Sequence, residues 1–457
     1  MNPASLFRVL FLYTGIMKAS LFTRLIVILI FFSISAFPLR GHTEELSVTE
    51  IVENLFSTEN AEAKKAFTYI SQKKPAEAIP ILKSILTSRD NQGKYAVAYR
   101  ALLQYPITAS FSTWIDVLND SPSFLIQTKI IKHLSLTRDK RIVLPIVQQL
   151  SSPFYTVRKT SIQVLKNYND DRIYPHILNM ANSRNPLFRI YSLEAMYHLY
   201  DQRLYDLLME MLKDKNHSVR YYTLHCLEKN DLSKSLNTIK RTAIQDSNPE
   251  VRVKAIHIIS KSRSYSPYNV LVQCIADSNR EVRFAAIEAL GNLNYDSTAG
   301  RMSSQLYSET DKGVKELIID TLIRFDTGAG FRGLSKVLLQ DSDVMLKVRS
   351  AYAMGAIEDR RAIPYLFQGL QDNDTRVVAE VCNALGNYDR SDVIEKLVSI
   401  INSNRSHYTR TSALYSLKRI KSKSSLLPLF DRYSREKDPV MKFKLKETIR
   451  YLIREFS

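Results

Sequence analysis

The sequence predicts an all-α fold, an α-solenoid superhelix of about 11–12 helical hairpins with a period of 31–32 residues. A pair consisting of an apolar residue and a base recurs at this spacing from Ile126-Gln127 to Met441-Lys442. In a few units, as in the first, another residue replaces the base. A large apolar residue stands seven positions after each base position, from Leu134 to Ile449. No stretch alternates apolar and polar residues long enough to predict a strand.

The pattern of the second half of each unit predicts an amphipathic helix. In one unit, Val282, Ala286, Ala289, Leu290 and Leu293 fall at i, i+4, i+7, i+8 and i+11, which is one face of a helix. Three positions after the base the side chain is mostly small, so neighbouring helices can approach closely. The large column seven positions after the base is expected to fill the layer between them.

A polar turn precedes each of these helices. In the turn at 246–250, Asn248 is placed to cap the helix, and Pro249 suits its first turn, where a missing N–H costs nothing. A shorter apolar segment, such as 270–276, lies before each turn. Each unit is therefore helix, turn, helix, and it buries its apolar faces only by stacking on its neighbours.

The composition is that of a globular protein and names no reaction. Of the 457 residues, 45% are apolar and 24% are charged, which excludes wholesale disorder. Lys and Arg number 64 against 46 Asp and Glu, a net charge of +18. Cys226, Cys274 and Cys382 lie far apart in apolar runs. This spacing excludes a zinc ribbon and a disulfide framework, and predicts buried free thiols.

The N-terminus predicts an exported protein. Residues 1–40 contain four bases and no acid, and the run 25–37 is apolar except for two serines. At thirteen residues the run suits a signal peptide better than a membrane span of about 20 residues. Met17 is an alternative start, and an uncleaved anchor is the alternative to cleavage. Because bases before the run stay inside, either form places the body in the periplasm or at the envelope.

Three segments follow from these patterns. Residues 1–40 are a signal peptide or signal anchor, residues 41–94 a helical N-terminal cap of degenerate repeats, and residues 95–457 the repeat solenoid.

The units resemble HEAT repeats, in particular the short bacterial kind named after phycobilin lyases. The pattern Asp-x-x-x-x-Val-Arg-x-x-Ala-x-x-Ala-Leu-Gly stands best from Asp277 to Gly291. The resemblance implies that turn acids and helix bases, six residues apart, pair within and between units as a structural ladder rather than as acid–base catalysts. Ser152, Ser183 and Asn404 interrupt the acid side of this ladder, and Val378 interrupts its base side. The ladder residues that match best are Asp214, Arg220, Asp246, Arg252, Asp277, Arg283, Asp341 and Lys347.

The catalytic and metal-binding residues of enzymes built on such repeats have few equivalents in this sequence. Deoxyhypusine hydroxylases hold iron with His-Glu pairs, and none of the eight histidines precedes Glu. HEAT-like DNA glycosylases use a basic groove with aromatics and an Asp, for which Trp114 and Asp116 are the nearest equivalent. His225 and His257 share a column, but only the distant Glu288 stands as a third ligand. We predict no catalytic residue, no metal site and no cofactor.

The candidate binding surface lies on the exposed side of the second helices, predicted to be concave. Positions one, two and five residues after the base are not required for stacking, so large aromatics there are candidates for binding. We expect these side chains to be at least partly exposed. The patch comprises Tyr191, Tyr221, Tyr222, His225, His257 and Phe284.

The sequence as a whole favours a non-catalytic, exported HEAT-repeat scaffold or adaptor that binds a partner protein on its concave face. The positive charge favours an acidic partner or an anionic envelope surface, and nucleic acid is not expected. The alternative is an intracellular HEAT-like protein acting on nucleic acid or on protein modification, as glycosylases or lyases do, with a misleading N-terminus.

Overall fold

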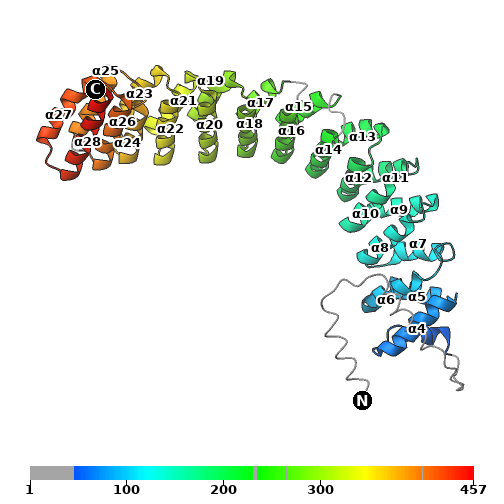
Figure 1. Ribbon diagram of the computed structural model, residues 1–457. Helices are drawn as coiled ribbons and strands as arrows, with labels where there is room; N and C mark the ends of the chain where they lie inside the picture. Colours follow the sequence, from blue (N-terminus) through cyan, green and yellow to red (C-terminus); the bar gives the residue numbers. More distant parts are fainter. Residues whose placement is uncertain (1–45, 230–233, 263–265, 404, 457) are drawn as a thin grey trace, which may run out of the picture. The chain divides into compact units, whose positions relative to one another are not determined.

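The computed structural model describes residues 46–229, 234–262, 266–403 and 405–456, and in these ranges the chain is helical and without strands (Figure 1). The all-α prediction is therefore confirmed. The predicted signal sequence and the alternative start lie outside the described residues. Within the described ranges, no helix combines the length and apolar character that a membrane span requires.

The first compact unit extends to Ile130. Its core includes Leu82, Leu86 and Trp114, all fully buried. The predicted division at 94–95 falls between a 3-10 turn, η1 (Arg89–Lys94), and the following helix, and the three-segment division stays a prediction. The α-helices that begin in this unit are α3 (Val48–Asn54), α4 (Asn60–Lys73), α5 (Ala78–Thr87), α6 (Tyr95–Leu102), α7 (Phe111–Asp120) and α8 (Phe124–Ser135).

The second compact unit runs from Ile131, and its described residues contain ten helical hairpins, each with an odd-numbered first and an even-numbered second helix. Its helices are α9 (Val143–Gln148), α10 (Tyr155–Leu165), α11 (Ile173–Ala181), α12 (Pro186–His198), α13 (Tyr205–Met211), α14 (His217–Lys229), α15 (Leu236–Gln245), α16 (Pro249–Lys261), α17 (Tyr268–Cys274), α18 (Arg280–Asn292), α19 (Ala299–Ser308), α20 (Lys312–Phe325), α21 (Phe331–Gln340), α22 (Val344–Ala356), α23 (Ile363–Gly369), α24 (Thr375–Leu385), α25 (Ser391–Asn402), α26 (His407–Ile420), α27 (Leu426–Arg435) and α28 (Pro439–Phe456). Single 3-10 turns lead into or follow several first helices, namely η2 (Lys140–Ile142), η3 (Gln149–Ser151), η4 (Gln202–Leu204), η5 (Asp296–Thr298), η6 (Gly328–Gly330), η7 (Arg360–Ala362) and η8 (Lys423–Ser425).

The hairpins of the second unit stack into two layers (Figure 1). From α12 onward each even-numbered helix packs on the next, and odd-numbered helices form the other layer. The large column seven positions after the base is buried throughout, from Leu165 to Ile449, as predicted. Leu293 is an exception to the predicted core face. It is 38% exposed because α18 ends at Asn292 and Leu293 is only its capping residue.

The polar turns cap the second helices as expected. The side chain of Asn248 accepts from the backbone N–H groups of Glu250 and Val251, and Pro249 occupies the first turn of α16. Glycines allow the even-numbered helices to approach closely. A Cβ atom on Gly355 would lie 2.7 Å from Cα of Ala384 on α24, so α22 and α24 are held in backbone contact.

The bases and turn acids form a buried ladder between units. The Arg252 guanidinium donates through Nη1 to the Asp246 carbonyl oxygen of its own turn (2.7 Å). It donates through Nε and Nη2 to the Asp277 carboxylate of the next turn (2.9 and 2.7 Å). Arg220 and Arg283 bond in the same way, Arg220 to Asp246 and Arg283 to Glu309.

The predicted pairing between units is therefore present, but the predicted ion pair within a unit is replaced. The base meets a backbone carbonyl there, because the turn carboxylate instead accepts from a backbone N–H two residues on, as Asp246 does from Asn248 (2.9 Å). The lysines keep the link between units, with Lys315 on Asp341 and Lys347 on Asp372.

Two of the predicted interruptions of the ladder are bridged by other residues, and the one predicted at Asn404 lies outside the described residues. Ser183 has no carboxylate, and Arg158 pairs instead with Glu194 on α12 (2.8 Å). Val378 is no base, and Arg405 from the following turn donates to the carbonyl oxygens of Leu370 (2.7 Å) and Asp372 (3.3 Å). A guanidinium, buried at Arg158 and half-buried at Arg405, thus makes a substitute contact where the repeat pattern fails.

Candidate protein-binding surface

The six side chains of the predicted patch lie on α12, α14, α16 and α18, all in the even-numbered layer. Tyr222 and His257 are exposed, and the other four are half-buried. Each of the six is thus at least partly open to solvent on the surface of this layer, which we call the even-numbered face.

Three residues of the patch form one group of rings with a further tyrosine. We call this group the aromatic cluster: Tyr197, Tyr221, Tyr222 and His225. The Tyr221 ring meets Tyr222 and His225 edge-on, with centroids 5.6 and 5.8 Å apart. Tyr222 stacks on His225 at 6.5 Å. Tyr197 of α12 reaches His225 at 6.3 Å, so the cluster joins two helices. Its rings are held by one another while their outer edges stay accessible.

Tyr197 was absent from the predicted patch. It lies eight positions after Arg189, a column in which the next unit has Glu228, so the repeat pattern gave no aromatic signal there. Lys229 fixes it, because its Nζ lies 4.2 Å from the Tyr197 ring centroid and donates to the Tyr197 carbonyl oxygen (2.6 Å).

Tyr191 serves packing, contrary to the argument that placed it in the patch. The Arg158 guanidinium lies 3.8 Å from its ring centroid, so this tyrosine covers a ladder base. Two positions after the base, Lys254 and Ala285 are buried as well. At Tyr191, Lys254 and Ala285 the prediction that this column is free of stacking is therefore wrong, and Lys254 pairs with Glu228 of the neighbouring even-numbered helix (2.5 Å). Tyr222, which belongs to the same column, is 46% exposed as predicted.

The remaining patch residues stand apart. Among the described rings, none of the recorded aromatic contacts joins His257 or Phe284 to the aromatic cluster.

Burial lowers the pKa of His225, and the nearby Lys254 lowers it further against the opposing effect of Glu228. His225 is therefore neutral at pH 7, and it presents a polar ring without a charge.

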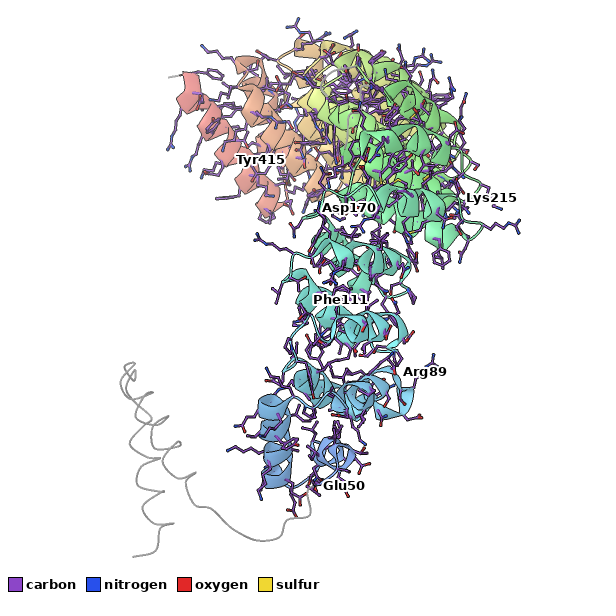
Figure 2. The ribbon with its side chains drawn as sticks, turned by 90° about the vertical axis from the view of Figure 1, so that its right-hand side faces the viewer. Glu50, Arg89, Phe111, Asp170, Lys215 and Tyr415 are labelled. Atoms are coloured by element: carbon purple, nitrogen blue, oxygen red, sulfur yellow. The ribbon has the colours of Figure 1, made fainter. Side chains whose placement is uncertain are left out.

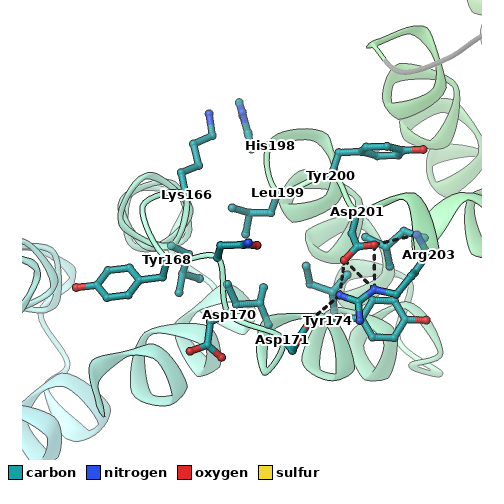
Figure 3. Close-up of a pocket in the computed structure, with 15 residues that line it drawn as sticks. Lys166, Tyr168, Asp170, Asp171, Tyr174, His198, Leu199, Tyr200, Asp201 and Arg203 are labelled. Carbon is teal, nitrogen blue, oxygen red and sulfur yellow. Dashed lines mark hydrogen bonds and ion pairs between the residues drawn. The ribbon is translucent and has the colours of Figure 1, made fainter. Parts of the chain in front are cut away.

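A separate hollow of about 390 Å³ lies where the loops after α10 and α12 meet (Figure 3). The aspartates that line this hollow already form ion pairs with arginines. Arg203 donates to Asp201 (2.5 Å) and Asp171 (3.0 Å), and Arg172 lowers the pKa of Asp170 to about 2. These Asp-x-Arg turns recur before several first helices and serve as caps, so the hollow offers no free carboxylate for chemistry.

The residues weighed for enzymatic roles are engaged in structure. Trp114 is fully buried, and Asp116 pairs with Lys83 at 2.6 Å. Burial raises the pKa of each of the three cysteine thiols to about 12. In the described part of the chain, no three His, Cys, Asp or Glu side chains gather as a metal-binding group.

A family model of HEAT repeats matches residues 142–228, 239–323 and 331–443, more than half of the chain. The chain therefore belongs to the HEAT-repeat family, and it is a HEAT-repeat solenoid. No curated protein matches the sequence.

Solved structures with similar folds include importin beta, crystallised with ammonium sulfate, at 12% identity and a TM-score of 0.41. A mutant of Kap121p matches at 11% identity and a TM-score of 0.42. A chain of a homology model of the AP-3 complex matches at 13% identity and a TM-score of 0.45. Each match covers 89% of this chain. The chain spans only 61% of the importin beta chain and 56% of the Kap121p chain, but 90% of the AP-3 chain. These likenesses concern the fold alone.

Proposed function

We propose that this HEAT-repeat protein is a non-catalytic, exported scaffold that binds a partner protein through the aromatic cluster on its even-numbered face. A HEAT-repeat solenoid is a protein-binding scaffold in its architecture, since its stacked second helices present a long continuous surface. The observation that carries the site is the set of half-open rings on α12 and α14.

The aromatic cluster has the properties of an interface anchor. Tyrosine is enriched among the residues that dominate binding energy, because it offers a large apolar area and a polar tip. The rings already hold one another in edge-on and stacked contacts, so ordering them on binding costs little further side-chain entropy.

The charge around the cluster favours an acidic partner. Lys159, Lys166 and Lys229 all lie close enough to His198 that, after burial, they lower its pKa. Lys159, Lys166 and Lys229 are exposed, and they are not among the recorded ion pairs of the described residues. An acidic segment seated on the aromatic cluster would neutralise them.

The binding test uses Tyr221→Ala together with Tyr222→Ala. A partner captured from envelope extract by the wild-type chain should bind the double variant at least tenfold more weakly, because truncated anchors lose about 2 kcal/mol or more. The melting temperature should stay within about 2 °C, since Tyr222 is 46% exposed and Tyr221 is only half-buried. Tyr307→Ala, a 48% exposed tyrosine on α19 in the other layer, is the matched control. Equal losses from both variants, or a marked drop in melting temperature, would contradict the site.

Export is tested by fractionation of cells that express the chain with and without residues 1–40. The full chain should be recovered from the periplasm or envelope and the truncated chain from the cytoplasm. The same location for both would refute the exported role while leaving the binding site open to test.

A further inference from the structure

A second part of the even-numbered face is hollowed and apolar. A depression of about 500 Å³, which we call the α22 groove, lies over α20, α22 and α24. Met345 and Tyr352 lie about two turns apart on the same face of α22 and are 54% and 55% exposed, and the half-buried Val348 lies between them. A hollowed surface on which several exposed apolar side chains adjoin is more typical of a binding site than single exposed side chains are.

The carboxylates of the groove outnumber its available bases. Lys312 is paired with Asp343 (2.6 Å), and Arg349 is paired with Asp320 through two bonds (2.8 and 2.6 Å). Glu316 and Glu380 also line the groove, and neither is in the recorded ion pairs of the described residues. The groove is therefore locally acidic.

Glu380 is the better placed of these two acids. It is half-buried, its recorded hydrogen bond comes from the Asn383 amide (3.2 Å), and burial raises its pKa. Arg419, the base that acts on it, donates to the carbonyl oxygens of Gly386 and Asn383 instead. A carboxylate that has lost hydration without gaining a base binds an incoming cation strongly.

Tyr352 also differs from three tyrosines elsewhere in the chain whose rings are covered by a cation. Tyr191, Tyr197 and Tyr307 each have a lysine or arginine over the ring, at 3.8, 4.2 and 3.6 Å from the centroid. No such contact is recorded for Tyr352 among the described residues. Its exposed ring is thus an acceptor for a cation from a partner.

We propose that the α22 groove binds a basic segment of a partner protein, with an apolar side chain on Met345 and Val348 and with lysine or arginine side chains at Glu380, Glu316 and the Tyr352 ring. Ionic screening limits the reach of surface charges to about 10 Å, so these local carboxylates outweigh the chain's net charge of +18. The close contact of Gly355 with α24 holds the groove in shape before binding. The groove lies on other helices than the aromatic cluster and takes the opposite charge.

The test selects ligands from a phage-displayed library of random peptides on the immobilised full chain. Enriched peptides should carry lysine or arginine beside an apolar residue. Synthetic dye-labelled copies should bind in solution by fluorescence anisotropy, and more weakly at high salt. Glu380→Gln with Tyr352→Ala should weaken this binding at least tenfold, and Glu316→Gln should weaken it several-fold.

Two controls keep the groove separate from the aromatic cluster and from misfolding. Tyr221→Ala with Tyr222→Ala should leave the affinity within twofold, and each groove variant should melt within about 2 °C of the wild type. If no basic peptide is enriched, or if the groove variants bind as the wild type does, the proposal is wrong. Equal losses from the groove and cluster variants overturn it as well.

Discussion

Replacing Arg283 with methionine should destabilise the second unit by about 3–5 kcal/mol at neutral pH, because it leaves a buried carboxylate without its base. The guanidinium bonds both oxygens of Glu309 at 2.8 Å and also donates to the carbonyl oxygen of Asp277 at 2.9 Å. Its side chain is 11% exposed and that of Glu309 only 2%, so water cannot replace these bonds. Methionine fills a similar volume, which isolates the loss of the charge.

The pH dependence distinguishes this mechanism from simple loss of packing. Burial alone would raise the pKa of Glu309, but the bonds from Arg283, the Asp311 N–H and the Gln305 amide outweigh it, and the pKa lies below its ordinary 4.5. The depressed pKa contributes stability that is present above about pH 4.5 and is lost as pH falls through the folded pKa. The gap between wild type and Arg283→Met should therefore be widest near pH 7 and should narrow below about pH 4.5.

Urea denaturation followed by far-UV circular dichroism measures the gap at each pH. Amide hydrogen exchange should localise the loosening to α18 and α20, because repeat arrays open in local units. Adding Glu309→Gln, which keeps an oxygen for the Asp311 N–H, should recover most of the loss. Arg361→Met, which breaks the exposed pair with Asp359, should leave the transition unchanged. A loss below about 1 kcal/mol for Arg283→Met, or a gap that does not vary with pH, would refute the ladder as a source of stability.

Three further outcomes test the stacking. Leu290→Ala should cost about 2–5 kcal/mol by urea denaturation, since Leu290 is fully buried, and a loss under about 1 kcal/mol would place its column outside the core. Gly355→Ala should cost about 1–3 kcal/mol because its Cβ would press on Ala384, whereas the matched helical variant Gly300→Ala meets no atom within 4 Å and should be neutral or stabilising. Similar effects from both glycine variants would argue against close helix contact. The buried thiols should resist alkylation in the native state and react in urea, and rapid native labelling would contradict their burial. These thiols are Cys226, Cys274 and Cys382.

The sequence predicted the repeat and its local structure because both are set by short-range periodicity. The buried column at Leu290, the cap at Asn248 and the first-turn Pro249 each depend on residues within one unit, and the structure has all three. The partial exposure of Tyr222 and His257 follows from the same helical phase.

The ion pairs between units were predicted, but two other contacts of the ladder bases were not. Arg252 was expected to form an ion pair within its own unit as well. In the structure it donates there to the backbone carbonyl oxygen of Asp246, and its ion pair is with Asp277 of the next unit. Tyr191 was predicted not to be needed for stacking, yet its ring lies against the guanidinium of Arg158 on α10, the preceding even-numbered helix.

By itself, the sequence determined the all-α repeat, its period and the face of each helix that is buried, because helical phase is fixed by neighbours three and four positions apart. Only the tertiary structure decided which rings form the aromatic cluster and that Met345, Tyr352 and Glu380 share one groove. Those contacts depend on the distance and rotation between successive hairpins. Close approaches such as that of Gly355 to α24 set these quantities, and no single unit encodes them.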